Sequence, residues 1–230
     1  MKKFNPIIDF FNLMYPNLCV VCNENLLSNE MHLCMKCLHE MPKTNFHLDK
    51  NNPIEKRFWG KVEITSCTAY FYFHKGSPFQ KILHSLKYRA NKELGQLLGK
   101  YAAVDLLDSI NFSSVDIIVP VPLHPKKLKS RGYNQSEWIG MGLSEILQKP
   151  QDTTTLIRVQ ENSTQTKKSV FERYENTEGI FKLSDNTILA GKHILLVDDV
   201  MTTGSTLEAC IKALQQTENV KVSVFTLAVA

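Results

Sequence analysis

The chain has 230 residues, of which 43% are hydrophobic, and its formal net charge is +4 at pH 7. This is an ordinary soluble composition that can fill a core, and the mild charge permits contact with phosphates or nucleic acid without requiring it. No apolar run approaches the length of a transmembrane helix, which excludes a membrane-spanning protein. Lys2 and Lys3 begin the chain, but Asn5, Pro6 and Asp9 interrupt the apolar run of a signal peptide. We therefore expect a cytoplasmic protein.

Two Cys-x-x-Cys pairs lie near the amino terminus. Four thiolates match the tetrahedral coordination of structural zinc, and cytoplasmic cysteines are more often metal ligands than disulfides. A redox dithiol, an iron–sulfur centre or two disulfides are the alternatives, and His32 or His39 could replace one cysteine. We predict a closed Zn²⁺ site that folds a module over residues 1–45 and has no open position for catalysis. Its ligands are Cys19, Cys22, Cys34 and Cys37.

The next segment connects this module to the main domain. Pro42 to Trp59 is rich in Asn, Lys and Pro and predicts a linker, whereas Val62 to Phe73 is dense in β-branched and aromatic residues and predicts a hairpin at the edge of a sheet. We therefore expect residues 46–75 to contain a linker followed by the first strands of the main domain. The single cysteines, Cys67 and Cys210, lie in apolar surroundings and are expected to be buried.

The main domain, residues 76–230, continues with helices. Pro78 begins a helix through Leu86, and another begins near Lys92. Between them, Lys87 and its neighbours Tyr88 and Arg89 suit phosphate or nucleic acid, although a solvated helix end explains them equally well.

A buried strand over Asp116 to Val121 then runs into a loop with several cations. The loop contains Lys126, Lys127, Lys129 and Arg131. A helix with an apolar face through Ile139, Gly142, Leu143 and Ile146 follows, which makes this a strand–loop–helix unit. Its loop is expected at the same edge of the sheet as the loop after Asp199, where the cations can converge on an anion.

A polar segment from Arg158 to Glu178 includes Lys167 and Lys168. Its lack of apolar periodicity predicts a long mobile loop. Such a loop is either a lid over a charged ligand or solvated disorder.

The most informative segment runs from Ile194 to Thr206. Ile194 to Val197 predicts a strand buried on both faces, as in a parallel sheet covered by helices. Asp198 and Asp199 follow, and their acceptor oxygens suit sugar hydroxyls or a cation. Thr202, Thr203, Gly204, Ser205 and Thr206 then offer hydroxyls and backbone N–H groups at the start of a helix that extends to about Gln216, which suits phosphate. An ordinary strand–turn–helix with a capped helix is the alternative. A last strand over Val220 to Ala228 completes the sheet.

This segment resembles the phosphoribosyl pyrophosphate loop of type I phosphoribosyltransferases. The resemblance implies that Asp198 and Asp199 meet the ribose hydroxyls, that Thr202 to Thr206 hold the 5′-phosphate, and that Arg131, Gly132 and Tyr133 belong to the loop that contacts pyrophosphate. It also implies an α/β fold with a parallel sheet flanked by helices, to which the small four-cysteine zinc module is fused.

The order of motifs along nearly the whole chain resembles the ComF family of bacterial competence proteins. These motifs are the paired Cys-x-x-Cys, Leu86-Lys87-Tyr88, Pro120 to Leu123, Arg131 to Gln135, Gln165-Thr166, Glu172-Arg173 with Asn176, and the Asp198 loop. The resemblance implies a role in handling single-stranded DNA taken up in natural transformation, with other competence proteins as partners.

Two functions of different classes follow. As an enzyme, the protein would bind phosphoribosyl pyrophosphate with Mg²⁺ and transfer ribose 5-phosphate to an unidentified nitrogen acceptor, with Asp198 and Asp199 orienting the sugar and Arg131 stabilising the leaving pyrophosphate. As a binding protein, it would use the same pocket to hold single-stranded DNA, with lysines along the track and Tyr88, Tyr133 or Trp138 stacking on bases.

Overall fold

The computed structural model of the protein describes residues 16–159, 179–185 and 187–230. Its centre is a parallel sheet of four strands in the order β1-β6-β5-β2. The strands are β1 (Ser66–Tyr72), β2 (Ile117–Pro120), β5 (His193–Met201) and β6 (Lys221–Val229). Because all four run in the same direction, their carboxyl ends meet at one edge, where ligands bind in open α/β sheets.

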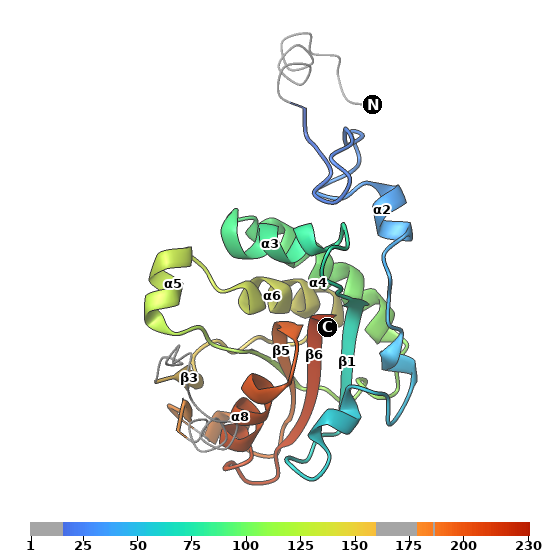
Figure 1. Ribbon diagram of the computed structural model, residues 1–230. Helices are drawn as coiled ribbons and strands as arrows, with labels where there is room; N and C mark the ends of the chain where they lie inside the picture. Colours follow the sequence, from blue (N-terminus) through green and yellow to red (C-terminus); the bar gives the residue numbers. More distant parts are fainter. Residues whose placement is uncertain (1–15, 160–178, 186) are drawn as a thin grey trace.

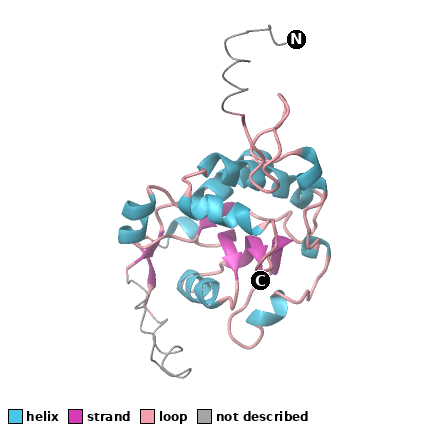
Figure 2. Cartoon of the chain, turned by 45° about the horizontal axis from the view of Figure 1, so that its top comes forward, coloured by secondary structure: helices cyan, strands magenta, loops and turns pink. Residues whose placement is uncertain are grey.

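Helices cover both faces of the sheet (Figures 1 and 2). On one face lie α3 (Gln80–Tyr88), α4 (Lys92–Leu107) and α6 (Gln135–Leu147), and on the other lies α8 (Ser205–Leu214). Alternate residues of β5 serve the two faces: Leu195 and Val197 pack with the first group, and Ile194 and Leu196 with α8. This arrangement confirms the α/β fold with a parallel sheet flanked by helices.

The leading strand differs from the prediction. The stretch Val62 to Phe73 contains one strand, β1, which pairs in parallel with β6 at the edge of the sheet, so the predicted hairpin is wrong. A run of β-branched and aromatic residues identifies a strand, but it does not identify the strand's partner, and here that partner lies at the far end of the chain.

The segment predicted to be a linker also carries core residues. It contains the short 3-10 helices η1 (Phe46–Leu48) and η2 (Glu55–Phe58), and Phe46, Ile54 and Phe58 are buried with the α8 side of the sheet. Because most residues of this segment are polar, the sequence did not indicate that Phe46, Ile54 and Phe58 belong to the core.

Four other elements were not predicted. A short helix α5 (Pro125–Arg131) lies in the cationic loop, where the His124 ring accepts a hydrogen bond from the Lys126 backbone N–H and Pro125 begins the helix. Strands β3 (Leu156–Arg158) and β4 (Phe181–Leu183) pair in an antiparallel ribbon, and η3 (Thr187–Leu189) precedes β5. The predicted lid falls almost entirely on residues 160–178, outside the described residues.

The amino-terminal module contains the short helix α2 (Met35–His39) and packs against α3. Cys19, Val21 and Cys37 belong to the same buried cluster as Ile82 and Leu86 of α3. The Lys81 ammonium of α3 donates a 2.7 Å hydrogen bond to the Val21 carbonyl.

Candidate functional site

The site begins at the carboxyl end of β5. This strand continues through Asp198 and Asp199 to Met201 because its pairing with β6 extends that far, so the two aspartates lie within the last part of the ladder and not in the loop. Asp198 accepts a 3.0 Å hydrogen bond from the Ser136 hydroxyl at the start of α6. Asp199 forms a 3.1 Å ion pair with the ammonium of Lys87, from the last turn of α3. Three elements from distant parts of the chain therefore meet at this acidic pair.

The carboxyl group of Asp198 differs electrostatically from that of an exposed aspartate. Burial, together with the negative charge of Asp199, raises the pKa of Asp198 to about 7, although the hydrogen bonds from the Asp199 backbone N–H and Ser136 oppose this shift. Asp198 can therefore change its protonation state near neutral pH.

The loop after β5 carries exposed hydroxyl groups at the start of α8. Thr202, Thr203 and Ser205 are exposed, and the hydroxyls of Thr203 and Ser205 lie 3.0 Å apart. Gly204 precedes α8 with φ 85°, a conformation that favours glycine, and a Cβ there would lie 3.2 Å from Cε of Met201. Among the described residues, the backbone N–H groups of Thr203 and Gly204 find no acceptor. Unpaired N–H groups at the start of a helix can hold an anion.

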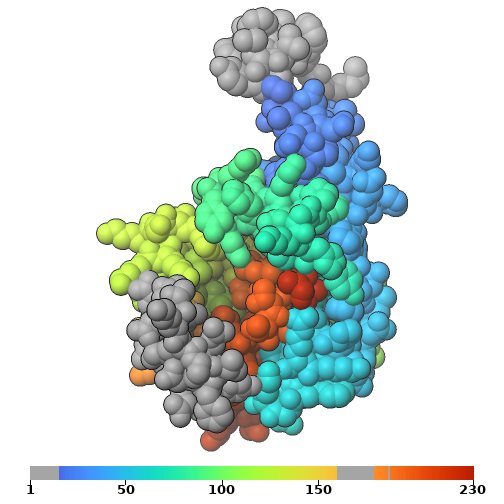
Figure 3. All heavy atoms as spheres, in the orientation of Figure 1, coloured from blue at the N-terminus to red at the C-terminus, as the bar shows by residue number. Residues whose placement is uncertain are grey.

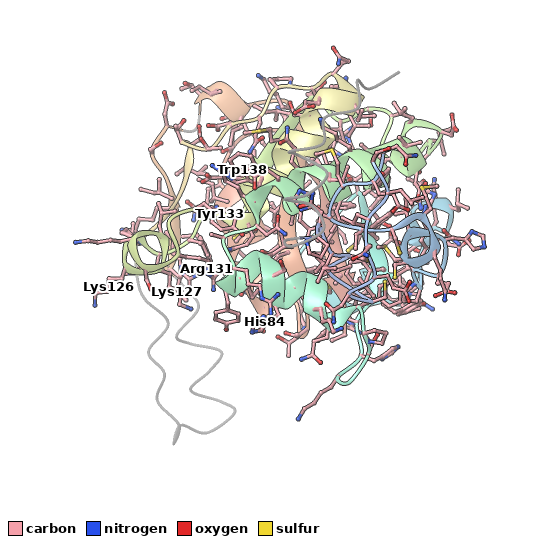
Figure 4. All side chains as sticks on the ribbon, turned by 90° about the horizontal axis from the view of Figure 1, so that it is seen from above. His84, Lys126, Lys127, Arg131, Tyr133 and Trp138 are labelled. Atoms are coloured by element: carbon pink, nitrogen blue, oxygen red, sulfur yellow. The ribbon has the colours of Figure 1, made fainter. Side chains whose placement is uncertain are left out.

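The second loop reaches the same edge of the sheet. Arg131 of α5 donates a 2.6 Å hydrogen bond from Nη1 to Oε1 of Gln135. The Tyr133 hydroxyl and the Gln135 amide both donate to the Leu86 carbonyl of α3, and Gly132 ends α5 with φ 82°. Tyr133 is only 8% exposed, so its ring joins the loop to α3 instead of facing solvent. Figure 4 shows Lys126, Lys127 and Arg131 together on α5.

The structure thus brings together only part of the predicted set. Asp198, Asp199 and Lys87 are in contact, and the loop from Thr202 to Thr206 follows directly. Arg131 is held by Gln135, Lys127 is exposed on α5, and Lys168 lies outside the described residues. Ser136 was missed, because its contact with Asp198 joins residues 62 positions apart.

The four predicted zinc ligands form a compact cluster. Their sulfur atoms lie within 4.8 Å of one another, and Cys22 Sγ is 3.7 Å from Cys34 Sγ. Four sulfurs at about 2.3 Å from one ion would be about 3.8 Å apart, so the donor set fits tetrahedral zinc. All six cysteines are free thiols, and the cluster includes neither His32 nor His39.

Cys67 and Cys210 are fully buried, as predicted. Within the part of the chain that the structure describes, no helix is both long and apolar enough to cross a bilayer.

Comparisons with known proteins show which proteins this chain is similar to. The phosphoribosyl transferase domain family matches residues 134–229, from the start of α6 to the end of β6. DNA utilization protein YhgH of Salmonella typhimurium is 31% identical over 232 residues, covering 94% of this chain and 98% of that protein. Competence protein F of Haemophilus influenzae is 27% identical over 233 residues, covering 96% and 99%. A solved hypoxanthine phosphoribosyltransferase from Staphylococcus aureus aligns with 15% identity and a TM-score of 0.38, covering 64% of this chain and 71% of that one.

Proposed function

The chain belongs to the ComF family of phosphoribosyltransferase-like proteins, and on that basis we propose that it binds phosphoribosyl pyrophosphate at the carboxyl end of β5. The observation that carries the proposal is the junction of β5 and α8. There an acidic pair is followed, after Val200 and Met201, by exposed hydroxyls and by N–H groups that find no acceptor among the described residues. The carboxylates would accept hydrogen bonds from the ribose hydroxyls, and the loop would hold the 5′-phosphate.

We further propose that bound substrate is activated for transfer of ribose 5-phosphate. As the bond from the ribose carbon to pyrophosphate lengthens, positive charge develops on the ring and negative charge on the leaving group. The carboxylates of Asp198 and Asp199 would stabilise the positive charge on the ring, and the Arg131 guanidinium would stabilise the negative charge on the leaving pyrophosphate. Oxygen donors of the acidic pair and the substrate suit Mg²⁺, which would supply further neutralisation of the leaving group when bound.

A second candidate function, binding of single-stranded DNA, is favoured by one observation. Tyr88 is 71% exposed at the end of α3, directly after Lys87, and the cationic residues Lys126, Lys127 and Lys129 of α5 are exposed as well. The relatives named for competence and DNA utilization are consistent with it. Of the three aromatic rings considered for base stacking, Tyr88 suits the role best. Tyr133 is buried, and the ammonium of Lys92 lies 4.7 Å from the ring centre of Trp138.

Titration calorimetry tests both candidates on the zinc-loaded protein. We expect phosphoribosyl pyrophosphate to bind more tightly with Mg²⁺ than without it. Asp198→Asn/Asp199→Asn should abolish this binding, because amides cannot replace two charged acceptors. Asp49→Asn/Asp108→Asn removes the same charge from exposed positions and serves as the matched control. Retained sugar-phosphate binding by the first variant would exclude the proposed site.

The same titration with a single-stranded oligonucleotide tests the second candidate function and distinguishes it from the first. DNA binding should weaken steeply with salt and with Lys126→Gln/Lys127→Gln/Lys129→Gln, and it should survive loss of the acidic pair. Oligonucleotide binding without sugar-phosphate binding would mean that the pocket serves as a nucleic-acid site.

A further inference from the structure

A residue outside every recognised motif contacts the phosphate loop, by which we mean residues 202–206. Arg57 of η2 donates from Nη1 to the Thr202 carbonyl, and from Nη2 to the Ala230 carbonyl at 3.1 Å. Its neighbour Phe58 lies below the same loop, 3.8 Å from the position that a Cβ on Gly204 would occupy. Figure 3 shows the orange end of β5 and its loop between green α3 and the cyan segment that contains η2.

The contact with Thr202 fixes the direction of one peptide group. The described chain has no cis peptide bond, and in a trans peptide the C=O and N–H point in opposite directions. Because the Thr202 carbonyl points toward Arg57, the N–H of Thr203 in the same peptide group points away from Arg57. That N–H is one of the two in the loop that find no acceptor among the described residues.

The chemistry of arginine suits this role. A planar guanidinium offers several donors in a fixed fork, and it can hold two carbonyl oxygens at once. Without Arg57, the carbonyl oxygens of Thr202 and Ala230 would lose this hydrogen-bond donor, and their partial negative charges would disfavour an anion nearby. The peptide group between Thr202 and Thr203 would also be free to rotate. The Ala230 N–H also donates to the Met201 carbonyl, at 3.0 Å, so Arg57 joins two backbone segments that already lie side by side.

We infer that Arg57 is a positioning residue for phosphate: it holds the peptide between Thr202 and Thr203 so that the Thr203 N–H faces the bound 5′-phosphate. This inference rests on the proposed function and adds to it a residue from η2. The segment predicted to be a linker therefore supports the site.

The test compares binding of ribose 5-phosphate to the wild-type protein, Arg57→Gln and Arg57→Lys. Arg57→Gln should lose about tenfold in affinity, which corresponds to about 1.4 kcal/mol. Arg57→Lys keeps the charge but not the fork, so it should recover only part of that loss. Lys56→Gln is the matched control. It removes a cation from the same turn, one whose ammonium lies over the ring of Trp59 and not on the loop.

Amide spectra provide a readout that a general loss of stability would not give. On addition of inorganic phosphate, the Thr203 amide of the wild-type protein should shift together with the Ser205 amide. In Arg57→Gln, the Ser205 amide should still shift, because the start of α8 remains, whereas the Thr203 shift should be largely lost.

Four results would overturn the inference. Equal affinity of Arg57→Gln and wild type would exclude it, and so would an equal loss in Lys56→Gln, which would indicate a general charge effect. If the Arg57 variants do not fold, the wild-type spectrum decides: a Ser205 shift without a Thr203 shift excludes the role. If the wild-type protein binds neither ribose 5-phosphate nor inorganic phosphate, the proposed function itself fails and the role of Arg57 fails with it.

Discussion

At the scale of single residues, the ionised form of Asp198 opposes folding. Asp198 and Asp199 are adjacent in sequence and shielded from solvent, and among the described residues the Lys87 ammonium forms its ion pair with Asp199. An arrangement that raises the pKa of a carboxyl group stabilises the protein less when that group is ionised than when it is protonated. Such sites persist where a ligand makes use of them.

Asp198→Asn should therefore stabilise the protein at alkaline pH. The folded pKa of Asp198, about 7, lies above its ordinary value of 3.8, so the native state binds a proton more readily than the unfolded state. At low pH, the wild-type protein therefore loses little or no stability relative to the Asn variant. As pH rises toward 7, its free energy of unfolding falls relative to that of the variant, and above pH 7 the difference changes little. We expect a gain on the order of 1–3 kcal/mol at about pH 8, measured by urea unfolding, and a much smaller gain at about pH 4.5.

Asp199→Asn provides the comparison. It removes the charge that raises the pKa of Asp198, but it also breaks the ion pair with Lys87. Its effect at alkaline pH should be smaller than that of Asp198→Asn. A gain in Asp198→Asn that is the same at both pH values would contradict the elevated pKa.

Contacts between distant residues explain which members of the site could not be predicted. The acidic pair and the loop lie within one segment, and their residue types alone predict binding of sugar hydroxyls and phosphate. Ser136 and Arg57 reach the same site from 62 and 145 residues away. Neither has a local pattern that distinguishes it from other polar residues, so only the folded chain identifies them.

At the scale of elements, a close crossing of α4 and α6 positions the start of α6 and hence Ser136. A Cβ on Gly142 would lie 2.0 Å from the Gln96 carbonyl oxygen, and one on Gly99 would lie 2.2 Å from the Ile139 carbonyl oxygen. Both obstacles are backbone atoms, so relief requires the helices to separate. The apolar face through Ile139 and Gly142 could be predicted from helical periodicity, but the closeness of the partner helix could not.

Gly142→Ala should accordingly destabilise the protein by about 3 kcal/mol or more, beyond ordinary overpacking. Gly95→Ala is the control on the same pair of helices. Its Cβ would meet the flexible end of Leu86 at 3.3 Å, and the higher helix propensity of alanine offsets the strain, so we expect a change within about 1 kcal/mol. Thermal and urea unfolding measure both. Similar stabilities for the two variants would contradict a backbone-limited crossing.

The outer edge of the sheet is closed by side chains of the segment predicted to be a linker. The Asn52 amide donates a 2.8 Å hydrogen bond to the Cys67 carbonyl of β1, and the Glu55 carboxylate accepts a 2.9 Å hydrogen bond from the Cys67 N–H. Together they satisfy both backbone groups of a buried edge residue, as a neighbouring strand would. Asn52 also accepts from the N–H groups of Ile54 and Glu55, which begins the turn that presents Arg57.

Asn52→Ala should cost about 1–3 kcal/mol, because the Cys67 carbonyl would be left buried without a donor. Asn52→Asp separates the two roles of this side chain, since it keeps the acceptor toward Ile54 and Glu55 and loses the donor toward Cys67. We expect it to be at least as unstable as Asn52→Ala in urea unfolding. Wild-type stability of Asn52→Asp would show that only the acceptor matters.

At the scale of the whole molecule, the cysteine module is joined to the site through α3. The module packs on α3 through Cys19, Val21 and Cys37, and α3 carries Lys87 to Asp199 at its far end. The sequence predicts a self-contained metal module, but it does not predict that the module forms part of the main core. Because the module shares a buried cluster with Ile82 and Leu86, the predicted zinc would also hold the cover of α3 in place.

Removal of the predicted zinc should therefore affect both stability and ligand binding. Without an ion, four clustered thiols do not hold a segment with so little core of its own, and chelation should cost several kcal/mol, seen as a lower melting temperature. Since α3 then loses its cover, affinity for ribose 5-phosphate should fall as Lys87 becomes less well held at Asp199. Re-addition of Zn²⁺ should restore both properties. If the melting temperature falls and affinity does not change, the module stabilises the fold without supporting the site, whereas purified protein without stoichiometric metal would contradict the zinc site itself.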